Sequence, residues 1–298
     1  MNYSTYKQSL TAYKRDRKYT TILGVQVNST EQARVLTRVE GWIAKKGRFF
    51  VVTPNPEIVM MAQDDTVLTR ILNRADISLP DGVGLVWASK ILSVNQLSEI
   101  GSRIVGLSDN RKTGKLKTEN RKMKTEKPIL HRVSGVDVME ALIGLASKRG
   151  WRVFLLGGKP GVAEEAADKL KIKNLKLKIE ADPGPLLDSN GQPINNAERM
   201  KEREVIKKIS LFSPHLLFVG FGAPKQEKWV ASNYNKLQTL GTMVVGGAFD
   251  YISGRIPRAP KWMREVGFEW LFRLIVEPWR LRRQFALLRF AWAVLNSH

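Results

Sequence analysis

The sequence has 298 residues, a hydrophobic content of 43% and a formal net charge of +21. This length and composition are typical of a globular protein and exclude an intrinsically disordered chain. The chain has no cysteine, which excludes disulfides, thiol catalysis and cysteine-bound zinc, and its three histidines lack ligand spacing. The positive charge predicts an anionic partner, which could be nucleic acid, an acidic membrane surface or a phosphorylated substrate.

The first segment, residues 1–20, is basic and lacks the apolar core of a signal peptide. No run of about 18 apolar residues occurs, so the sequence predicts no transmembrane helix. We therefore expect a cytoplasmic protein. The first elements are then a β-branched strand at residues 21–27 and a helix that begins after Ser29 or Thr30 and ends near Lys46.

A second predicted strand, residues 48–53, ends where prolines on either side of Asn55 cannot continue a β-ladder. A helix is predicted next, over residues 57–63. Thr53 and Asn55 therefore lie at the C-terminal end of a strand. Their side chains either cap the following helix or face a ligand, and the residues alone leave both interpretations open.

The next loop is Leu79-Pro80-Asp81-Gly82-Val83-Gly84, which precedes an apolar helix start at residues 85–90. The proline favours an extended approach, and the glycines after Asp81 permit positive φ and close contact between backbone and ligand. Asp81 would thus lie between a strand end and a helix N-terminus, where open α/β sheets bind ligands. The alternative is an ordinary N-cap aspartate.

Residues 93–127 interrupt this alternation of strands and helices. They are polar and basic, with nine Lys or Arg residues between positions 103 and 127. Such a composition predicts a mobile insertion rather than a folded element. Its charge is either simply solvated or binds an anion.

Alternation returns at residue 132, where Ser134 or Asp137 could cap a helix. The predicted helices are 138–148, 162–170 and 199–210, and the predicted strands are 151–156, 176–180, 215–220 and 243–245. Because strands alternate with helices and end in Gly or Pro turns, we expect an α/β fold with a doubly wound, mainly parallel, Rossmann-like sheet. Its ligand cleft should be lined by the turns at the strand ends.

Three of these turns are rich in glycine. They are Gly157-Gly158-Lys159-Pro160-Gly161, Gly222-Ala223-Pro224-Lys225-Gln226-Glu227 and Gly246-Gly247-Ala248-Phe249-Asp250. A strand, a glycine turn and a helix form the frame of a nucleotide site, but the first turn matches neither the dinucleotide-binding G-x-G-x-x-G spacing nor the Walker pattern.

The tail, residues 255–298, contains four of the eight tryptophans and nine Lys or Arg residues. Apolar side chains between positions 268 and 276 predict one face of a helix, which Pro278 must break or restart. Tryptophan and arginine on an amphipathic helix fit a membrane interface. A helix pair packed on the core is the alternative.

Five stretches taken together resemble one family, the WecG/TagA/CpsF glycosyltransferases, over about residues 21–283. They are Thr53-Pro54-Asn55-Pro56-Glu57, Leu79-Pro80-Asp81-Gly82-Val83-Gly84, Phe154-Leu155-Leu156-Gly157-Gly158, Gly222-Ala223-Pro224-Lys225-Gln226-Glu227 and Gly246-Gly247-Ala248-Phe249-Asp250. The resemblance implies a GT-E type fold in three parts: the basic segment 1–20, an α/β domain at 21–254 with the insertion at about 95–127, and a membrane-associating helical appendage at 255–298.

This resemblance also implies a reaction. Family members invert the anomeric centre without a metal or cofactor when they move a sugar from a UDP-sugar to a polyprenyl diphosphate-linked sugar. The best-known reaction adds N-acetylmannosamine to undecaprenyl-diphosphate N-acetylglucosamine in wall teichoic acid synthesis. We therefore expect a hexosyltransferase attached peripherally to the inner face of the cell membrane, with an anionic lipid surface as a partner and homo-oligomers possible.

The resemblance assigns residues as well. Catalysis falls on Asp81, Thr53 and Asn55. Substrate binding falls on Gly157, Gly158, Gly222, Lys225, Gln226, Asp250, Arg273, Arg280 and Arg283. No Asp-x-Asp pair stands in a metal-binding context, so no metal site is expected. The insertion is unusual for the family, and Asp182-Pro183-Gly184-Pro185 stands where many members have an aromatic turn.

Two other functions compete with this one. A nucleic-acid-binding protein would explain the charge, but the basic residues form no recognition motif and such a protein would not need five glycine turns on a buried sheet. A dinucleotide-dependent dehydrogenase would need the missing glycine fingerprint. Within the family, N-acetylmannosaminuronic acid, glucose or galactose could replace N-acetylmannosamine as the transferred sugar.

Overall fold

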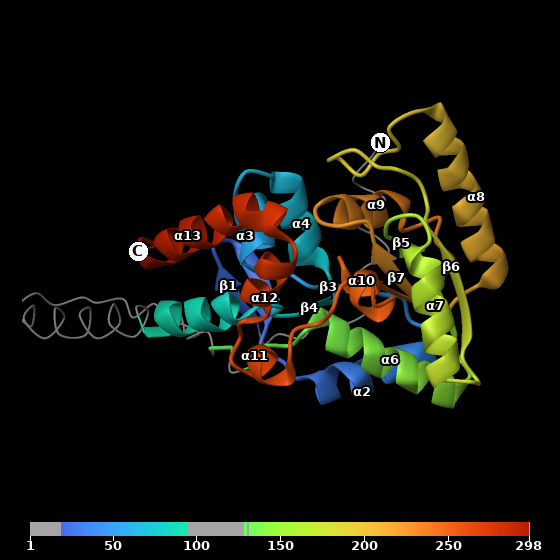
Figure 1. Ribbon diagram of the computed structural model, residues 1–298, viewed down its shortest axis with the longest axis horizontal. Helices are drawn as coiled ribbons and strands as arrows, with labels where there is room; N and C mark the ends of the chain where they lie inside the picture. Colours follow the sequence, from blue (N-terminus) through green and yellow to red (C-terminus); the bar gives the residue numbers. More distant parts are fainter. Residues whose placement is uncertain (1–18, 95–127, 130, 298) are drawn as a thin grey trace, which may run out of the picture.

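The computed structural model describes residues 19–94, 128–129 and 131–297, without the side chains of residues 282–284 (Figure 1). The predicted basic segment up to residue 18 and the predicted insertion at 95–127 lie outside the described residues, as does the side chain of Arg283. The three-part division at residues 20 and 254 stays a prediction.

A six-stranded parallel sheet forms the centre of the molecule, with the strand order β4-β3-β8-β7-β5-β6. The strands are β3 (Phe49–Val52), β4 (Ile77–Ser78), β5 (Arg152–Gly157), β6 (Lys178–Asp182), β7 (Leu216–Gly220) and β8 (Gly241–Val244). The chain crosses from β4 at one edge to β5 on the other side of the sheet, so the sheet is doubly wound as the alternating pattern predicted.

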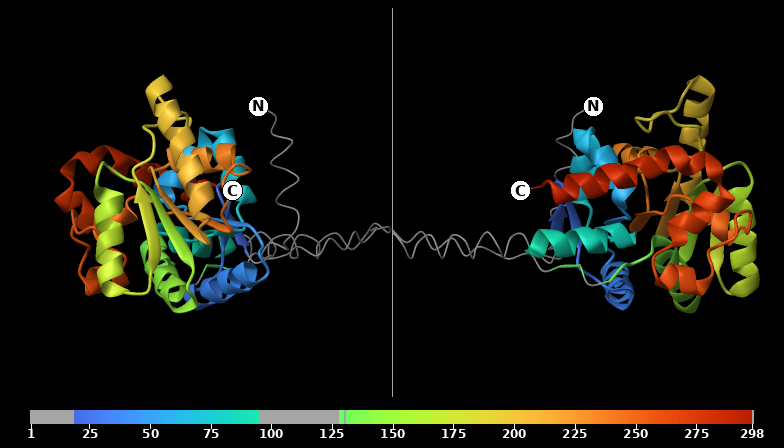
Figure 2. Two further views of the ribbon diagram at one scale, coloured as in Figure 1. Left: turned by 90° about the vertical axis from the view of Figure 1, so that its right-hand side faces the viewer. Right: turned by 60° about the vertical axis from the view of Figure 1, so that its left-hand side comes forward.

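Helices cover both faces of this sheet (Figure 2). They are α2 (Gln32–Ala44), α3 (Pro56–Gln63), α4 (Thr66–Arg74), α6 (Gly135–Arg149), α7 (Val162–Lys173), α8 (Asn196–Phe212), α9 (Lys225–Asn233) and α10 (Ala248–Ile252), with a further helix at residues 83–94. Because successive side chains of a strand point to opposite faces, each strand contributes to two cores.

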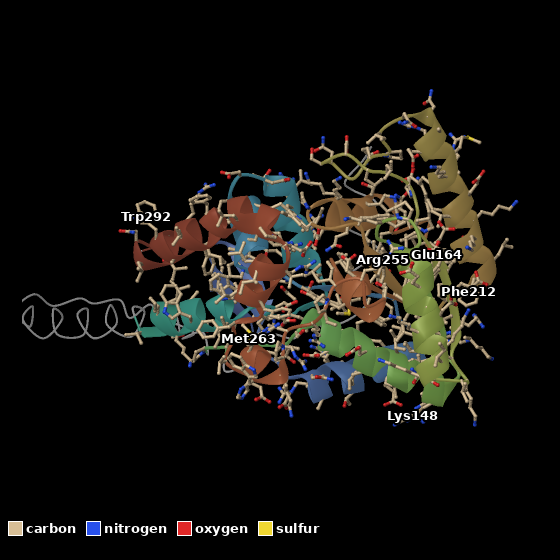
Figure 3. All side chains as sticks on the ribbon, in the orientation of Figure 1. Lys148, Glu164, Phe212, Arg255, Met263 and Trp292 are labelled. Atoms are coloured by element: carbon tan, nitrogen blue, oxygen red, sulfur yellow. The ribbon has the colours of Figure 1, made fainter. Side chains whose placement is uncertain are left out.

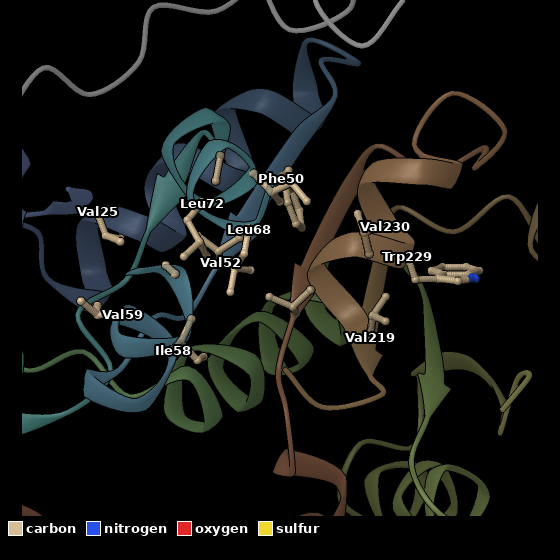
Figure 4. Close-up of a cluster of buried hydrophobic side chains, with 14 of the residues drawn as sticks. Val25, Phe50, Val52, Ile58, Val59, Leu68, Leu72, Val219, Trp229 and Val230 are labelled. Carbon is tan, nitrogen blue, oxygen red and sulfur yellow. The ribbon is translucent and has the colours of Figure 1, made fainter. Parts of the chain in front are cut away.

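The two cores are separate clusters of buried side chains. In β5, Phe154 and Leu156 join a cluster with α3, α4 and α9, whereas Val153 and Leu155 join a cluster with α2, α6 and α7. Figure 4 shows part of the first cluster, with Phe50 and Val52 of β3 close to Leu68 of α4. Strands buried on both faces have the continuous apolar runs that the sequence shows.

The predicted strand at residues 21–27 is wrong, because the chain folds there into a hairpin of β1 (Tyr19–Ile22) and β2 (Val25–Asn28). Leu23 and Gly24 form its turn with φ angles of 46° and 80°. Two consecutive positive φ values are the geometry that lets a two-residue turn reverse a strand. The predicted cap by Ser29 or Thr30 is also wrong, since α2 starts after Glu31 without a side-chain cap.

The tail forms α11 (Lys261–Glu265), α12 (Glu269–Val276), the 3-10 turn η1 (Pro278–Arg280) and α13 (Leu281–Leu295). Phe290 and Val294 of α13 are buried in the first core cluster, next to α3. Trp262, Trp279 and Trp292 are instead 63%, 71% and 69% exposed, and Figure 3 shows Trp292 on the outer side of α13. The tail therefore both packs on the core and presents apolar side chains to its surroundings.

None of the helices in the described part of the chain is both long enough and apolar enough to cross a bilayer.

Candidate active site

A cavity of about 490 Å³ opens where β3, β4, β7 and β8 end. The carboxyl ends of parallel strands meet at one edge of a sheet, and this edge is where α/β folds bind ligands. The cavity has the size of an ordinary small-molecule site. Seven residues that the sequence singled out line it: Thr53, Asn55, Asp81, Gly222, Gln226, Arg273 and Arg280.

Asp81 and its loop are held by two segments that are distant in sequence. Its N–H donates to the carbonyl oxygen of Pro54 at 3.0 Å, and the N–H of Val133 donates to that of Pro80 at 3.0 Å. Its Oδ2 atom accepts a hydrogen bond of 3.1 Å from the N–H of Gly135, at the start of α6. Among the described residues this carboxylate caps no N–H of the helix that follows it, so the N-cap alternative is not supported.

Two charged side chains connect Asp81 with the tail. The Nη2 atom of Arg132 lies 3.5 Å from Asp81 Oδ1 and also forms an ion pair with Glu269 of α12. Burial raises the pKa of Asp81, the Glu269 charge raises it further, and Arg132 and the Gly135 N–H oppose the rise. With 27% of its side chain still accessible from the cavity, Asp81 is a carboxylate suited to taking up a proton.

Thr53 and Asn55 lie beside this carboxylate on the loop after β3. A Cβ atom built on Gly135 would lie 2.9 Å from Thr53 Cγ2 and 3.2 Å from Asp81 Oδ2. The side chains of Thr53 and Asp81 therefore both pack on Gly135. Asn55 Oδ1 accepts from the Ile58 N–H at 2.9 Å and thereby caps α3. Capping is therefore part of the role of Asn55, and its position still places it on the cavity wall.

Gln226 joins two of the glycine turns. Its Oε1 atom accepts hydrogen bonds from the N–H groups of Gly222 at 3.2 Å and Gly246 at 3.1 Å. The side chain is only 1% exposed although it reaches the cavity wall. Gln226 thus holds together the ends of β7 and β8, so its removal should affect stability as well as any ligand.

The carboxyl group of Glu227 lies fully buried beside this link. Its Oε1 atom accepts from Gln226 Nε2 at 2.9 Å, which fixes the orientation of the Gln226 amide, and Oε2 has no hydrogen-bond partner among the described residues. Burial raises the pKa of Glu227 to about 7.

The tail brings two arginines to the opposite wall of the cavity. The buried carboxylate of Glu277 accepts from Arg273 Nε at 2.7 Å and lies 3.0 Å from Arg280 Nε, so it holds both guanidinium groups together across the break at Pro278. Arg273 also lies 4.9 Å from the ring centre of Tyr251, which lines the cavity. Such forks of N–H donors suit a phosphate or diphosphate group.

Four predicted binding residues do not line this cavity. Gly157 and Gly158 have φ angles of 108° and 85°, and the Gly158 N–H donates to Gly220, so these glycines let β5 and β7 end close together. Lys225 Nζ donates to the carbonyl oxygen of Leu187 at 2.7 Å. Asp250 lies behind the wall beside Gly247, and burial raises its pKa.

The sequence reasoning missed Arg132 and Glu269, which link the core and the tail. Arg132 stands where the alternation of apolar and polar segments returns after the predicted insertion, and Glu269 is one of only three acidic residues in the basic tail, so both positions carried a weak signal. Arg258 extends the link, 3.4 Å from Glu269 and 2.6 Å from Asp137. Neither position could be assigned a partner before the chain was folded.

Within the described ranges, no group of three or more His, Asp or Glu side chains is arranged to hold a metal ion.

Comparison with known proteins gives matches over most of the chain. The profile of the Glycosyl transferase WecG/TagA/CpsF family matches residues 20–107 and 121–298, so the unmatched stretch falls inside the predicted insertion. The N-acetylglucosaminyldiphosphoundecaprenol N-acetyl-beta-D-mannosaminyltransferase of Bacillus subtilis (strain 168) is 30% identical over 258 residues, which are 86% of this chain and 82% of that protein. The protein of the same name from Staphylococcus aureus (strain NCTC 8325 / PS 47) is 26% identical over 278 residues, 93% of this chain and 92% of that protein.

Proposed function

The chain belongs to the WecG/TagA/CpsF glycosyltransferase family, and from this premise we propose that it transfers N-acetylmannosamine from a UDP-sugar to undecaprenyl-diphosphate-linked N-acetylglucosamine. The enzyme names of the Bacillus and Staphylococcus relatives support this choice of sugar and acceptor. The product would serve the synthesis of a wall polymer such as teichoic acid. The observation that carries the proposal is a partly accessible carboxylate, Asp81, in one cavity with two tail arginines.

In the proposed reaction Asp81 is the general base. It takes the proton of the acceptor hydroxyl while the hydroxyl oxygen bonds to the anomeric carbon of the donor sugar. The bond between that carbon and the phosphate oxygen breaks from the opposite side, UDP leaves with the electron pair, and the configuration inverts. Arg132 and the Gly135 N–H hold the Asp81 carboxylate at the edge of the cavity throughout.

We propose that this chemistry needs neither a metal nor a cofactor. Negative charge develops on the departing UDP, and Arg273, which lies beside the turn at Gly247, offers fixed positive charge on the wall of the same cavity. Arg280 is proposed to bind the diphosphate of the acceptor. Gln226 shapes the nucleotide end of the cavity through the turns that end β7 and β8. Thr53 and Asn55 are proposed to orient the sugar beside Asp81.

We also propose that the protein works at the inner face of the cell membrane as a peripheral protein. The name of the Bacillus relative describes a diphosphoundecaprenol-linked acceptor, which is a lipid, and the tail exposes Trp262, Trp279 and Trp292. Aromatic side chains of this kind lie at the headgroup level, and the positive chain charge favours an anionic leaflet. Co-sedimentation with phosphatidylglycerol vesicles, but not with phosphatidylcholine vesicles, checks this part.

The proposal is tested by UDP release from a panel of UDP-sugars, with and without undecaprenyl-diphosphate N-acetylglucosamine. The panel contains N-acetylmannosamine, N-acetylmannosaminuronic acid, glucose and galactose. Acceptor-dependent release from UDP-N-acetylmannosamine alone is the expected result. Preference for another sugar would keep the enzyme class and change the donor, whereas no acceptor-dependent release with any donor would refute the proposed reaction.

A further inference from the structure

The cavity continues beyond Asp81 into an apolar side groove between the helix at residues 83–94 and α13. Val83 and Trp87 form one wall, Leu287 and Ala291 form the other, and all four line the same cavity as Asp81. Each pair is separated by four positions, so each lies along one face of its helix. In Figures 1 and 2 the two helices run side by side away from the sheet.

The inner end of this side groove is closed by close packing. A Cβ atom built on Gly84 would lie 2.7 Å from Pro56 Cγ, so the helix at 83–94 begins in tight contact with the start of α3. Phe290, which is 2% exposed, fills the space below. A Cβ atom built on Gly267 would lie 2.9 Å from Val83, so the turn before α12 packs on the wall. The side groove is therefore closely packed at its inner end.

The two ends of the side groove differ in chemistry. The inner end meets the polar part of the cavity, with Asp81, Arg273 and Arg280. On the outer side α13 continues with exposed Leu288, Trp292 and Leu295, and exposed Val94 lies in the last described turn of the other helix. A ligand that fits both ends must carry an anionic head and a long apolar chain.

We propose that the side groove holds the first isoprene units of the lipid-linked acceptor. This inference rests on the proposed function, in which the acceptor sugar reaches Asp81 and the acceptor diphosphate meets Arg280. The isoprenoid chain must then leave the cavity, and the side groove offers it an apolar exit toward the exposed apolar side chains of α13. Burying a branched chain against Trp87, Leu287 and Ala291 removes apolar surface of both partners from water.

The test compares two acceptors that share N-acetylglucosamine diphosphate and differ in its ester, farnesyl or methyl, with UDP-N-acetylmannosamine as donor and without vesicles. Trp87→Ala removes a wall, and Ala291→Phe fills the groove. Each variant should raise the KM for the farnesyl acceptor about tenfold, the loss expected for one large apolar contact, and leave the methyl acceptor within about twofold. Ile172→Ala is the control, because this exposed apolar residue of α7 lies outside the cavity and should change neither value.

The outcomes separate the two proposals. If the wild-type protein used neither acceptor nor the undecaprenyl acceptor, the proposed function would fall. If the wild-type protein used both short acceptors with the same KM, or if the variants changed both acceptors equally, the reaction would stand and the side groove would not be the isoprenoid site. Thermal unfolding of each variant shows that any loss comes from a folded protein.

Discussion

The two walls of the cavity are held in different ways. On the core wall, the N–H of Asp81 donates to Pro54 in the loop after β3, and the Asp81 carboxylate accepts from the N–H of Gly135 at the start of α6. On the tail wall, Arg273 and Arg280 are held by ion pairs with Glu277, within a segment that docks through charged groups and α13. Because Glu277 is buried, salt should screen these pairs little. The walls differ in their partners: backbone groups of the core hold Asp81, whereas a side chain of the tail holds the two arginines.

This difference indicates that the two walls have different functions. The position of Asp81 is set by the fold itself, so the base is in place whether or not the tail is fully docked. The arginines reach the cavity only when the tail lies on the core, and Arg132 contacts both Asp81 and the tail residue Glu269. We infer that the core wall carries the proton transfer and that the tail wall carries the positive charge for the two diphosphate groups, with Arg273 facing the departing UDP and Arg280 facing the acceptor.

The largest effect is expected at the core wall. Asp81→Asn keeps an oxygen that accepts from the Gly135 N–H but removes the base, so turnover should fall about 100-fold or more with an unchanged melting temperature. Turnover is measured as acceptor-dependent UDP release. A variant that retains near-normal turnover would remove Asp81 from the mechanism.

The next effect is expected at the tail wall. Arg280→Ala removes a guanidinium group that faces the cavity, and the KM for the lipid-linked acceptor should rise about tenfold, as for a lost hydrogen bond to a charged group. Arg289→Ala is the control, because Arg289 lies on the same tail, is 64% exposed and does not line the cavity. Equal losses in both variants would show that only the total charge of the tail matters.

A loss of stability is expected where Gln226 joins the turns after β7 and β8. Gln226→Ala leaves the N–H groups of Gly222 and Gly246 without their acceptor, and the free energy of unfolding should fall by about 1–3 kcal/mol. Urea unfolding measures it, with the exposed Gln238→Ala as control. An unchanged unfolding energy with weaker UDP binding would mean that Gln226 acts on the ligand alone.

A smaller effect is expected where the walls meet. The Glu269 charge raises the pKa of Asp81, so Glu269→Gln should lower it. Because only ionised Asp81 can take a proton, activity falls as the pH drops through this pKa, and the acid limb of kcat/KM should move to lower pH in the variant. Glu265→Gln, exposed on the same tail, should leave the limb in place. A limb that moves to higher pH would contradict the coupling.

No effect is expected from metal removal. If Arg273 neutralises the departing UDP, an excess of EDTA leaves the rate unchanged. Loss of activity that magnesium or manganese restores would show that the tail wall lacks the charge for this step.

Local patterns predicted much of the core wall. The apolar runs identified the strands of the parallel sheet, and the turn residues after them identified Thr53, Asn55 and Asp81 because strand ends of one sheet must meet. The hairpin at Leu23 and Gly24 was missed because a short β-branched run reads as one strand when its turn contains a leucine. This error concerns only the local path of the chain between β1 and β2.

The tail wall was harder to predict, because its arrangement depends on pairs that are distant in sequence. Helix periodicity could not show that Glu277 joins Arg273 to Arg280, nor that Arg132 meets Glu269 from 137 positions away. The pattern also left open whether the tail packs on the core or faces a membrane. In α13, buried Phe290 packs on the core, whereas Trp292 is exposed and available to a membrane surface.

The division between the walls is tested most directly by acceptor saturation curves for Asp81→Asn and Arg280→Ala, measured side by side with saturating UDP-N-acetylmannosamine. We predict that Asp81→Asn lowers kcat and leaves the acceptor KM unchanged, and that Arg280→Ala raises the acceptor KM and leaves kcat within about twofold. If instead both variants lowered kcat to the same extent with unchanged KM, the tail arginine would act in the chemical step and the division would be wrong.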